Sequence, residues 1–467
     1  MSLFYSQRNK DNRGGVNSIT PPLLLPFLCP SHYHLPDITP NQSSVGHSCR
    51  SPFYPSLTQS EATQNHRYIL FFDHFVRNRL IFNRINPLHS YILSSHSVIP
   101  GVKNEKSSNS YSYNLEASGT IKSFTLDSDV RYNGFYLYTF SDDNGKEYLS
   151  FLNYRTNQIL FYDFKTNEFL FKLNLATEGP NGIVQPTGFY IEDFDNIYVS
   201  SYAYSGLIKV DTTCRIIQKV PYGITSKGYK VLPSYNPASH PYIAPVVIDE
   251  KIYITQSAVD RFHPITDTPL SVVIDTIQKN CEGLPLTYSI LTEKELQAKD
   301  TRFSRIFNGE EFIYSFYVSE DIVVASVGHS DAKRVKVKSK YLDSPAEEQE
   351  VSEKGPQLNL EIARYGDLIY DPYRDVYYRF AYPKTTLEDN IRWWGKSVYG
   401  RKKFSVIILD KEFKIIGETL FPESIYNSYV FFVHKDGLYI SRDYQMIYGQ
   451  SEDYMTFELF NLVKGNV

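Results

Sequence analysis

Aromatic and cationic residues gather at a few places in this chain, and their types suit ligand recognition better than bond-breaking chemistry. Trp393 and Trp394 are the only 2 tryptophans and stand between Arg392 and Lys396. Neighbouring residues of a strand point to opposite faces, so at least one indole is exposed unless the pair lies in a loop. Exposed tryptophan beside cations is typical of binding surfaces, with loop packing as the alternative.

Tyr378 and Arg379 follow a predicted turn over 370–375 and point to opposite faces of the next strand. Arg379 must reach water, a carboxylate or a ligand, because burying an unpaired cation is costly. The preferred interpretation is a structural ion pair with Asp371 or Asp375. The alternative is an anion-binding and aromatic surface for a carboxylated peptide or sugar.

Two loops complete the predicted binding surface. His240 lies in a proline-rich loop over 235–242, which leads into the third repeat unit. Asn181 lies in the tight turn Gly179–Gly182, where Gly182 is expected to supply a positive φ and a purely structural role is preferred. The predicted binding set is therefore Asn181, His240, Tyr378, Arg379, Trp393 and Trp394.

Catalytic signatures are absent from the sequence, which has no GxGxxG, GxxxxGK[ST], HExxH or GxSxG pattern. The segment 328–331, Gly-His-Ser-Asp, places three triad residue types side by side, but triads are assembled by the fold and this segment falls at a predicted turn. Residues 142–145, Asp-Asp-Asn-Gly, resemble a calcium loop without its closing Glu, and a hairpin turn explains them. The sequence predicts no catalytic residues, no metal site and no cofactor.

Short alternating strands must position these candidates, and they begin near Gly119. The segments 135–140 and 148–152 flank Asn144-Gly145, a strong hairpin signal, and two further strands complete a four-stranded antiparallel unit. Similar units follow over roughly 188–220, 242–290, 303–342, 364–420 and 430–460, the last with three clear strands.

The segment 120–124 supplies the missing strand of the last unit, and such closure removes exposed sheet edges. We therefore predict an all-β fold, a β-propeller over residues 111–467. It should have six four-stranded blades, with five or seven as alternatives, and a ring closed by N- and C-terminal strands.

Residues 1–110 differ in texture, with 7 of the 11 His and 10 of the 25 Pro of the chain. We expect an irregular or disordered leader, or an extended gene start. The leader holds 10 basic and 5 acidic residues, whereas 111–467 holds 38 and 47, a balance of −9. That acidity argues against a nucleic-acid partner, and the lack of an apolar run of about 18 residues predicts no transmembrane helix.

Several short stretches carry a family resemblance. With its stretches 178–182, 186–189 and 193–199, the second unit resembles a blade of the six-bladed NHL-like propellers. Through the stretches 144–149, 178–182, 370–372, 377–379 and 436–440, the chain from about residue 115 resembles an uncharacterised family of bacterial exported six-bladed β-propeller lipoproteins, a domain of unknown function. The resemblance implies export to the periplasm or cell surface and attachment through a lipidated Cys, whereas Cys29 lacks the small preceding residue of a lipoprotein cleavage site.

The leading functional hypothesis is an exported propeller that binds a peptide, glycan or protein at the loop face of its central channel. Loops from every blade converge there, so a site needs no linear motif. The first alternative is a hydrolase or lyase that uses channel carboxylates, with or without Ca²⁺. The second is a scaffold with no small-molecule site.

Overall fold

The computed structural model describes residues 112–126, 130, 137–233, 243–258, 264–298, 300–343, 358–386, 400–443 and 453–465. Every described residue belongs to the unit Phe72–Val467. The candidates His240, Trp393 and Trp394 lie outside the described residues.

Strands dominate the described part of the chain, and the predicted all-β class is confirmed. The helical segments there are short: Ile265–Asp267, Tyr288–Ile290, α2 (Glu293–Gln297) and α3 (Leu358–Glu361). The strands are β1 Tyr113–Thr125, β2 Leu137–Ser141, β3 Glu147–Asn153, β4 Gln158–Asp163, β5 Phe169–Asn174, β6 Pro186–Asp193, β7 Asn196–Ser201, β8 Tyr204–Val210, β9 Ile216–Pro221, β10 Val246–Ile248, β11 Lys251–Thr255, β12 Ser271–Asp275, β13 Asn280–Gly283, β14 Phe303–Phe307, β15 Glu311–Phe316, β16 Asp321–Ser326, β17 Ala332–Lys336, β18 Arg364–Asp371, β19 Val376–Tyr382, β20 Ser405–Leu409, β21 Ile415–Leu420, β22 Asn427–His434, β23 Gly437–Ser441 and β24 Tyr454–Lys464.

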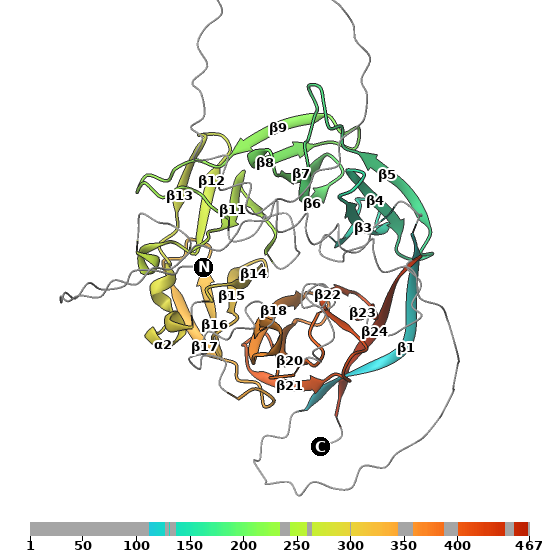
Figure 1. The fold of residues 1–467 in the computed structure, drawn as a ribbon, viewed down its shortest axis with the longest axis vertical. Coiled ribbons are helices and arrows are strands. Elements are labelled where there is room, and N and C mark those ends of the chain that lie inside the picture. The colour runs from blue at the N-terminus through green and yellow to red at the C-terminus, as the bar shows by residue number, and fades with distance from the viewer. Residues whose placement is uncertain are drawn as a thin grey trace, which may run out of the picture. The chain divides into compact units, whose positions relative to one another are not determined.

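Four sheets each contain four strands in sequence order: β2 to β5, β6 to β9, β10 to β13, and β14 to β17. Their neighbouring strands all pair antiparallel, as short connections require. Figure 1 shows these sheets following one another around a ring, with β6 and β14 toward its middle and β5, β9 and β17 toward its outside. The arrangement is that of a propeller.

The remaining strands form one eight-stranded sheet in the order β18-β19-β20-β21-β1-β24-β23-β22, so six separate blades are not what the structure shows. The join is a single parallel pairing of Tyr113 with Gly417 in β21. The 13-residue β1 is long enough to reach it. Gly417 permits the approach, because a Cβ there would clash with the Tyr113 carbonyl oxygen.

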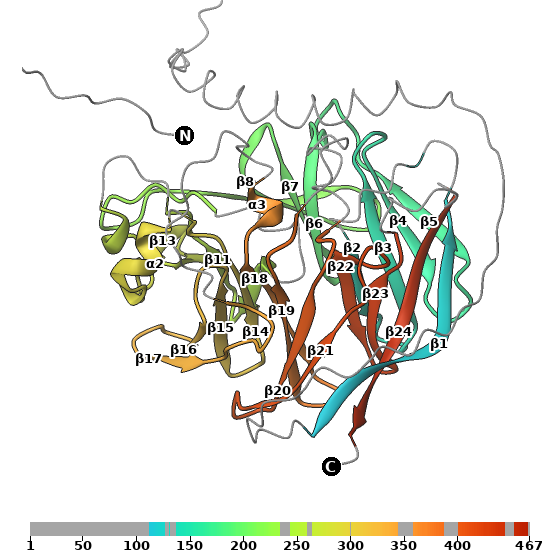
Figure 2. The ribbon, with the colours of Figure 1, turned by 60° about the horizontal axis from the view of Figure 1, so that its bottom comes forward.

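Ring closure by the ends of the domain is confirmed. β1 pairs antiparallel with β24 from Tyr113 opposite Lys464 to Thr125 opposite Tyr454, with a bulge after Ala117. The predicted closing segment 120–124 therefore lies beside the C-terminal strand, as Figure 2 also shows. The pairing gives β24 a hydrogen-bonded neighbour on each side.

The core lies between the sheets. Alternating strand residues bury apolar side chains on both faces of each sheet, as a ring of stacked sheets requires. Five buried clusters link neighbouring sheets in turn around the ring. The cluster containing Phe124, Phe151 and Phe457 packs the closing strands against the sheet β2 to β5.

The Asn144-Gly145 hairpin is confirmed between β2 and β3. The Asp142 carboxylate accepts hydrogen bonds from the backbone N–H of Asn144 at 3.0 Å and of Lys146 at 2.9 Å. Gly145 has φ +75°, a value that suits glycine. Asp142 thus has a structural role in the turn.

We expect removal of residues 1–110 to leave the propeller-like domain folded. All five buried clusters of the described residues are built from Leu115 onward. A protein starting at Tyr111 should melt within a few degrees of the full chain, as measured by calorimetry. If the shortened chain were insoluble instead, we would conclude that part of the leader contributes to the core.

Among the described residues, no helix is long and apolar enough to cross a membrane.

Candidate functional site

Arg379 is fully buried between two sheets, so a ligand at the loop face cannot reach it. Its Nε donates to Ser315 Oγ at 3.0 Å, and Nη1 donates to the carbonyl oxygens of Glu320 and Val337, both at 3.0 Å. Nη2 donates to the Ser319 carbonyl oxygen at 2.7 Å, with longer contacts to the same turn. Arg379 thus has a structural role, as preferred from the sequence. Its partners, however, are mainly backbone carbonyl oxygens of the preceding sheet, and the expected ion pair with Asp371 or Asp375 does not form.

The charge of Arg379 is retained in this interior. Its guanidinium carbon lies 3.9 Å from the centre of the Tyr365 ring. Burial lowers the pKa of Arg379 to about 10, so the side chain remains protonated at pH 7. Six acceptors and an aromatic face offset the cost of burying the cation.

Tyr378 points to the other face of β19, as predicted, and is fully buried. Its hydroxyl donates to Asp371 Oδ2 at 3.1 Å, and burial followed by the Asp371 charge raises the pKa of Tyr378. Asp371 also pairs with Arg374, which donates to the carbonyl oxygens of His434 and Lys435. Tyr378 therefore supports the turn between β18 and β19 from the interior.

Asn181 holds a loop in place. Its Oδ1 accepts a hydrogen bond from the Ile216 backbone N–H at 3.1 Å, which ties the loop before β6 to the start of β9. In the turn Gly179–Gly182 the positive φ belongs to Gly179, at +83°, and not to Gly182 as expected. Gly182 is instead crowded, since a Cβ there would lie 3.0 Å from the Glu178 carbonyl carbon. A ligand-binding role for Asn181 stays a prediction.

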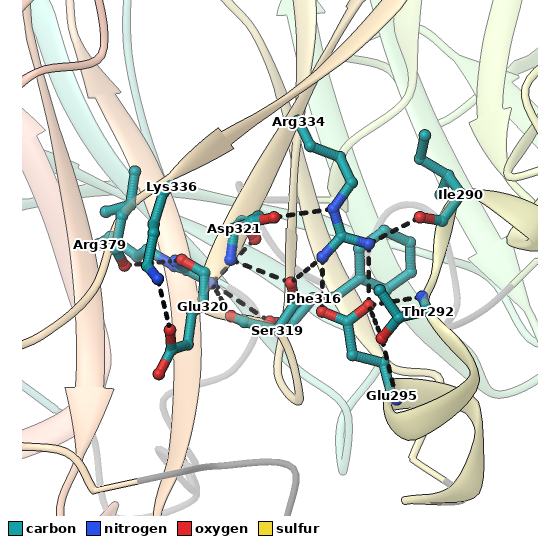
Figure 3. A network of polar contacts seen from close by, with 11 residues as sticks. Ile290, Thr292, Glu295, Phe316, Ser319, Glu320, Asp321, Arg334, Lys336 and Arg379 are labelled. Atoms are coloured by element: carbon teal, nitrogen blue, oxygen red, sulfur yellow. Dashed lines mark hydrogen bonds and ion pairs between the residues drawn. The ribbon is translucent and has the colours of Figure 1, made fainter.

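Arg334 organises a polar network around the same turn that Arg379 contacts (Figure 3). Its Nη1 and Nη2 donate to Glu295 at 2.9 and 2.7 Å, and its Nε donates to Asp321 at 2.8 Å. The spacing of Thr292 and Glu295 in the sequence predicts a capping box, and the structure confirms it at the start of α2. Lys336, which ends β17, pairs with Glu320 at 3.5 Å. These contacts indicate a structural network.

A second group of arginines lies at the edge of the sheets where the first strand of each sheet begins, called the loop face here. Arg302 immediately precedes β14, and Arg364 is the first residue of β18. Both hold Asp300: Arg302 donates through Nε at 2.7 Å and Nη2 at 2.6 Å, and Arg364 Nη1 lies 3.5 Å away. Burial raises the pKa of Asp300, but the hydrogen bonds and charges of the two arginines outweigh it and the net shift is downward.

Arg401 adds a third cation. It is buried, its guanidinium lies 5.3 Å from the centre of the Tyr382 ring, and its Nη2 donates to the Ile362 carbonyl oxygen just before β18. Burial, then the positive charge of Arg364, lowers the pKa of Arg401 to about 9. We call Arg302, Arg364 and Arg401 the arginine cluster. Because their charges repel one another, the cluster favours an anion nearby.

Aromatic and acidic residues surround the cluster. Tyr317, just after β15, lies under Arg302 with 5.6 Å between the guanidinium carbon and the ring centre. Its hydroxyl donates to Asp367 at 2.5 Å.

Glycines allow the chain segments to meet. A Cβ on Gly366 would overlap the Tyr382 ring, and Gly400 has φ +80° and lies against Asn427 and Ser428. Ser428 Oγ accepts a hydrogen bond from the Arg401 backbone N–H at 2.9 Å. Figure 2 shows α3, which leads into β18, at the upper edge of the sheets. The cluster is thus assembled from the starts of β14 and β18 and from the segment before β20, which packs against the start of β22.

Sequence reasoning missed the arginine cluster. Arg302, Arg364 and Arg401 stand far apart in the chain and form no motif. The available signal was positional, because Arg302 and Arg364 each stand at the start of a predicted unit, and first-strand starts converge at one face of a propeller. Among the described residues, no three His, Cys, Asp or Glu side chains lie together as a metal site.

The fold and this site define an all-β, propeller-like domain with an arginine cluster at its loop face. A family model for a domain of unknown function (DUF4221) matches residues 112–420. The chain belongs to this family.

The chain is similar to two solved structures. One is a member of the DUF4221 family from Bacteroides vulgatus, with 24% identity, a TM-score of 0.62, and coverage of 76% of this chain and 99% of that one. The other is a candidate exported protein of Bacteroides fragilis, with 11% identity, a TM-score of 0.47, and coverage of 77% and 98%. The first similarity supports the fold, and no curated protein matches.

Proposed function

We propose that this chain is a binding protein whose loop face takes a carboxylate-bearing ligand, either an acidic glycan or a peptide with a free carboxyl group. The observation that supports this most is the Arg302 guanidinium, which is partly exposed at the loop face, with the positive charges of the buried Arg364 and Arg401 behind it. Planar guanidinium groups recognise carboxylates through paired N–H donors.

The way the cluster holds Asp300 supports a carboxylate in particular. Arg302 donates hydrogen bonds to both carboxylate oxygens of Asp300, and Arg364 Nη1 lies 3.5 Å from Oδ2 of the same carboxylate. Tyr317, which is partly exposed, adds an aromatic face, and such faces are common in sites for sugars and peptides. His240, Trp393 and Trp394 belong to connections before β10 and between β19 and β20, and their predicted binding roles remain part of this proposal.

The enzyme alternative has less support. A hydrolase or lyase needs a positioned acid or base that the substrate can reach. His329, from the triad-like segment, is buried and bonded to Tyr314, which suits an interior role. The other alternative, a scaffold without a small-molecule site, predicts that no ligand binds in the experiment below.

Export to the periplasm or cell surface, and lipid attachment, are further proposals from the family resemblance. Fractionation of cells that make the native protein would test them.

We expect trigalacturonate, or a tetrapeptide with a free carboxyl terminus, to bind the wild-type chain more tightly than galactotriose or the amidated peptide. Arg302→Gln should weaken that binding by about 10-fold or more, because loss of a charged hydrogen-bond donor costs about 1.5–3 kcal/mol. Isothermal titration calorimetry measures the affinities. Arg302 is suitable because its side chain is 39% exposed, so the fold tolerates its change.

Arg215→Gln is the matched control. Arg215 also pairs with an aspartate through two nitrogens, Nε at 3.2 Å and Nη2 at 3.0 Å, but it lies in the turn between β8 and β9 at the opposite edge of the sheet. Its loss should leave ligand affinity unchanged. If neither carboxylate binds at millimolar concentration, or if both variants lose affinity equally, the proposed function is wrong.

A further inference from the structure

A buried polar cluster lies between the sheets β10 to β13 and β14 to β17, away from the loop-face site. It contains Thr255, Ser271, Arg305, Tyr314 and His329, all at most 2% exposed. Thr255 lies directly opposite Ser271, and Arg305 opposite Tyr314. Cross-strand partners share a face of their sheet, so these two pairs face each other across the sheet interface.

Arg305 brings a positive charge into this interior. Nη1 donates to Ser271 Oγ at 3.2 Å, and Nη2 donates to the carbonyl oxygens of Ala244 at 2.7 Å and Tyr253 at 3.1 Å. No carboxylate of the described residues forms an ion pair with it. By comparison, each of the three nitrogens of Arg379 donates a hydrogen bond, whereas Nε of Arg305 donates none.

The neighbouring hydroxyl groups already take part in a chain of hydrogen bonds in which each donor and acceptor is fixed. His329 Nδ1 lies 3.0 Å from the Val327 carbonyl oxygen, which only accepts, so Nδ1 carries the proton. Nε2 then accepts from the Tyr314 hydroxyl at 2.5 Å, and Tyr314 accepts from Ser271 at 2.7 Å. Burial lowers the pKa of His329 to about 4, so this neutral tautomer holds at pH 7.

Two buried donors are left over: Arg305 Nε–H and the Thr255 hydroxyl, neither of which has a hydrogen-bond partner. Both donors belong to side chains that neighbour Ser271, because Arg305 donates to its Oγ through Nη1 and Thr255 is its strand partner. A water molecule there would accept from both but would need acceptors for its own hydrogens. An anion needs none, and it also neutralises the buried cation.

We propose that Arg305 and Thr255 bind a small monovalent anion, of the size and charge of chloride, between these two sheets. The anion accepts hydrogen bonds from Arg305 Nε and Thr255 Oγ1 and holds the two sheets together. The site is structural and is separate from the carboxylate site at the loop face.

Chloride should raise the melting temperature of the wild-type chain by about 1–3 °C over sodium methanesulfonate of equal ionic strength, because an anion that binds only the folded state stabilises it. Thr255→Val, which removes one donor at nearly constant volume, should abolish the difference. Bromide in crystals should give an anomalous peak beside Arg305 Nε.

Thr187→Val is the matched control, since Thr187 Oγ1 is another buried hydroxyl without a partner but no arginine is bonded beside it. This variant should keep the full chloride response. Equal melting temperatures of the wild type in the two salts, or a bromide map without a peak at Arg305, would show a water site and overturn the proposal. A response lost in both valine variants would overturn it as well.

Discussion

Arg379→Ala should destabilise the domain by about 3–5 kcal/mol, the usual cost of breaking a buried charge network. The substitution removes the donors for Ser315 Oγ and for carbonyl oxygens of the turn between β15 and β16. Those oxygens are buried and would be left without partners, at about 1–3 kcal/mol each before relaxation. The loss should appear as a lower denaturant midpoint, or as insoluble protein.

Two companion variants make this result specific. Arg379→Lys keeps the charge but concentrates its donors on one atom, which cannot span acceptors from Ser315 to Val337, so it should recover only part of the stability. Arg215→Ala, whose side chain is 69% exposed, should cost less than about 1 kcal/mol. An Arg379→Ala protein as stable as Arg215→Ala would refute the structural role.

Local rules of sequence were sufficient for much of this fold. The Asn144-Gly145 hairpin and the capping box at Thr292 depend on residues within a few positions of one another, and both formed as expected. Strand alternation also placed Tyr378 and Arg379 on opposite faces correctly. These features follow from backbone geometry that neighbouring residues determine.

Contacts between sheets could not be predicted in the same way. The acceptors of Arg379 lie 42 to 64 residues away in the chain, so the sequence could show that the cation needed partners but not which ones. The arginine cluster similarly depends on which strand ends converge. The eight-stranded sheet depends on the close approach of Tyr113 to Gly417. Nothing in the sequence distinguishes Gly417 from any other glycine in a strand.

Truncation after Gln450 should abolish soluble folding, because it removes β24, which lies between β1 and β23. Loss of β24 leaves both neighbours with unpaired N–H and C=O groups, which invite aggregation. It also removes Met455 and Phe457, both fully buried, from the cluster that closes the ring. Size-exclusion chromatography and light scattering would show aggregated or insoluble protein.

A shorter truncation separates ring closure from a general sensitivity of the C-terminus. Removing only residues 466–467 leaves β24, which ends at Lys464, intact and should yield a monodisperse protein that melts like the full chain. Gly437→Ala perturbs the same contact within the full-length chain, because its Cβ would clash with the Phe460 carbonyl oxygen in β24. It should lower the melting temperature by several degrees. If the protein truncated after Gln450 were soluble and melted cooperatively, β1 and β23 would not need β24. Pairing of the chain ends would then contribute little to the free energy of unfolding.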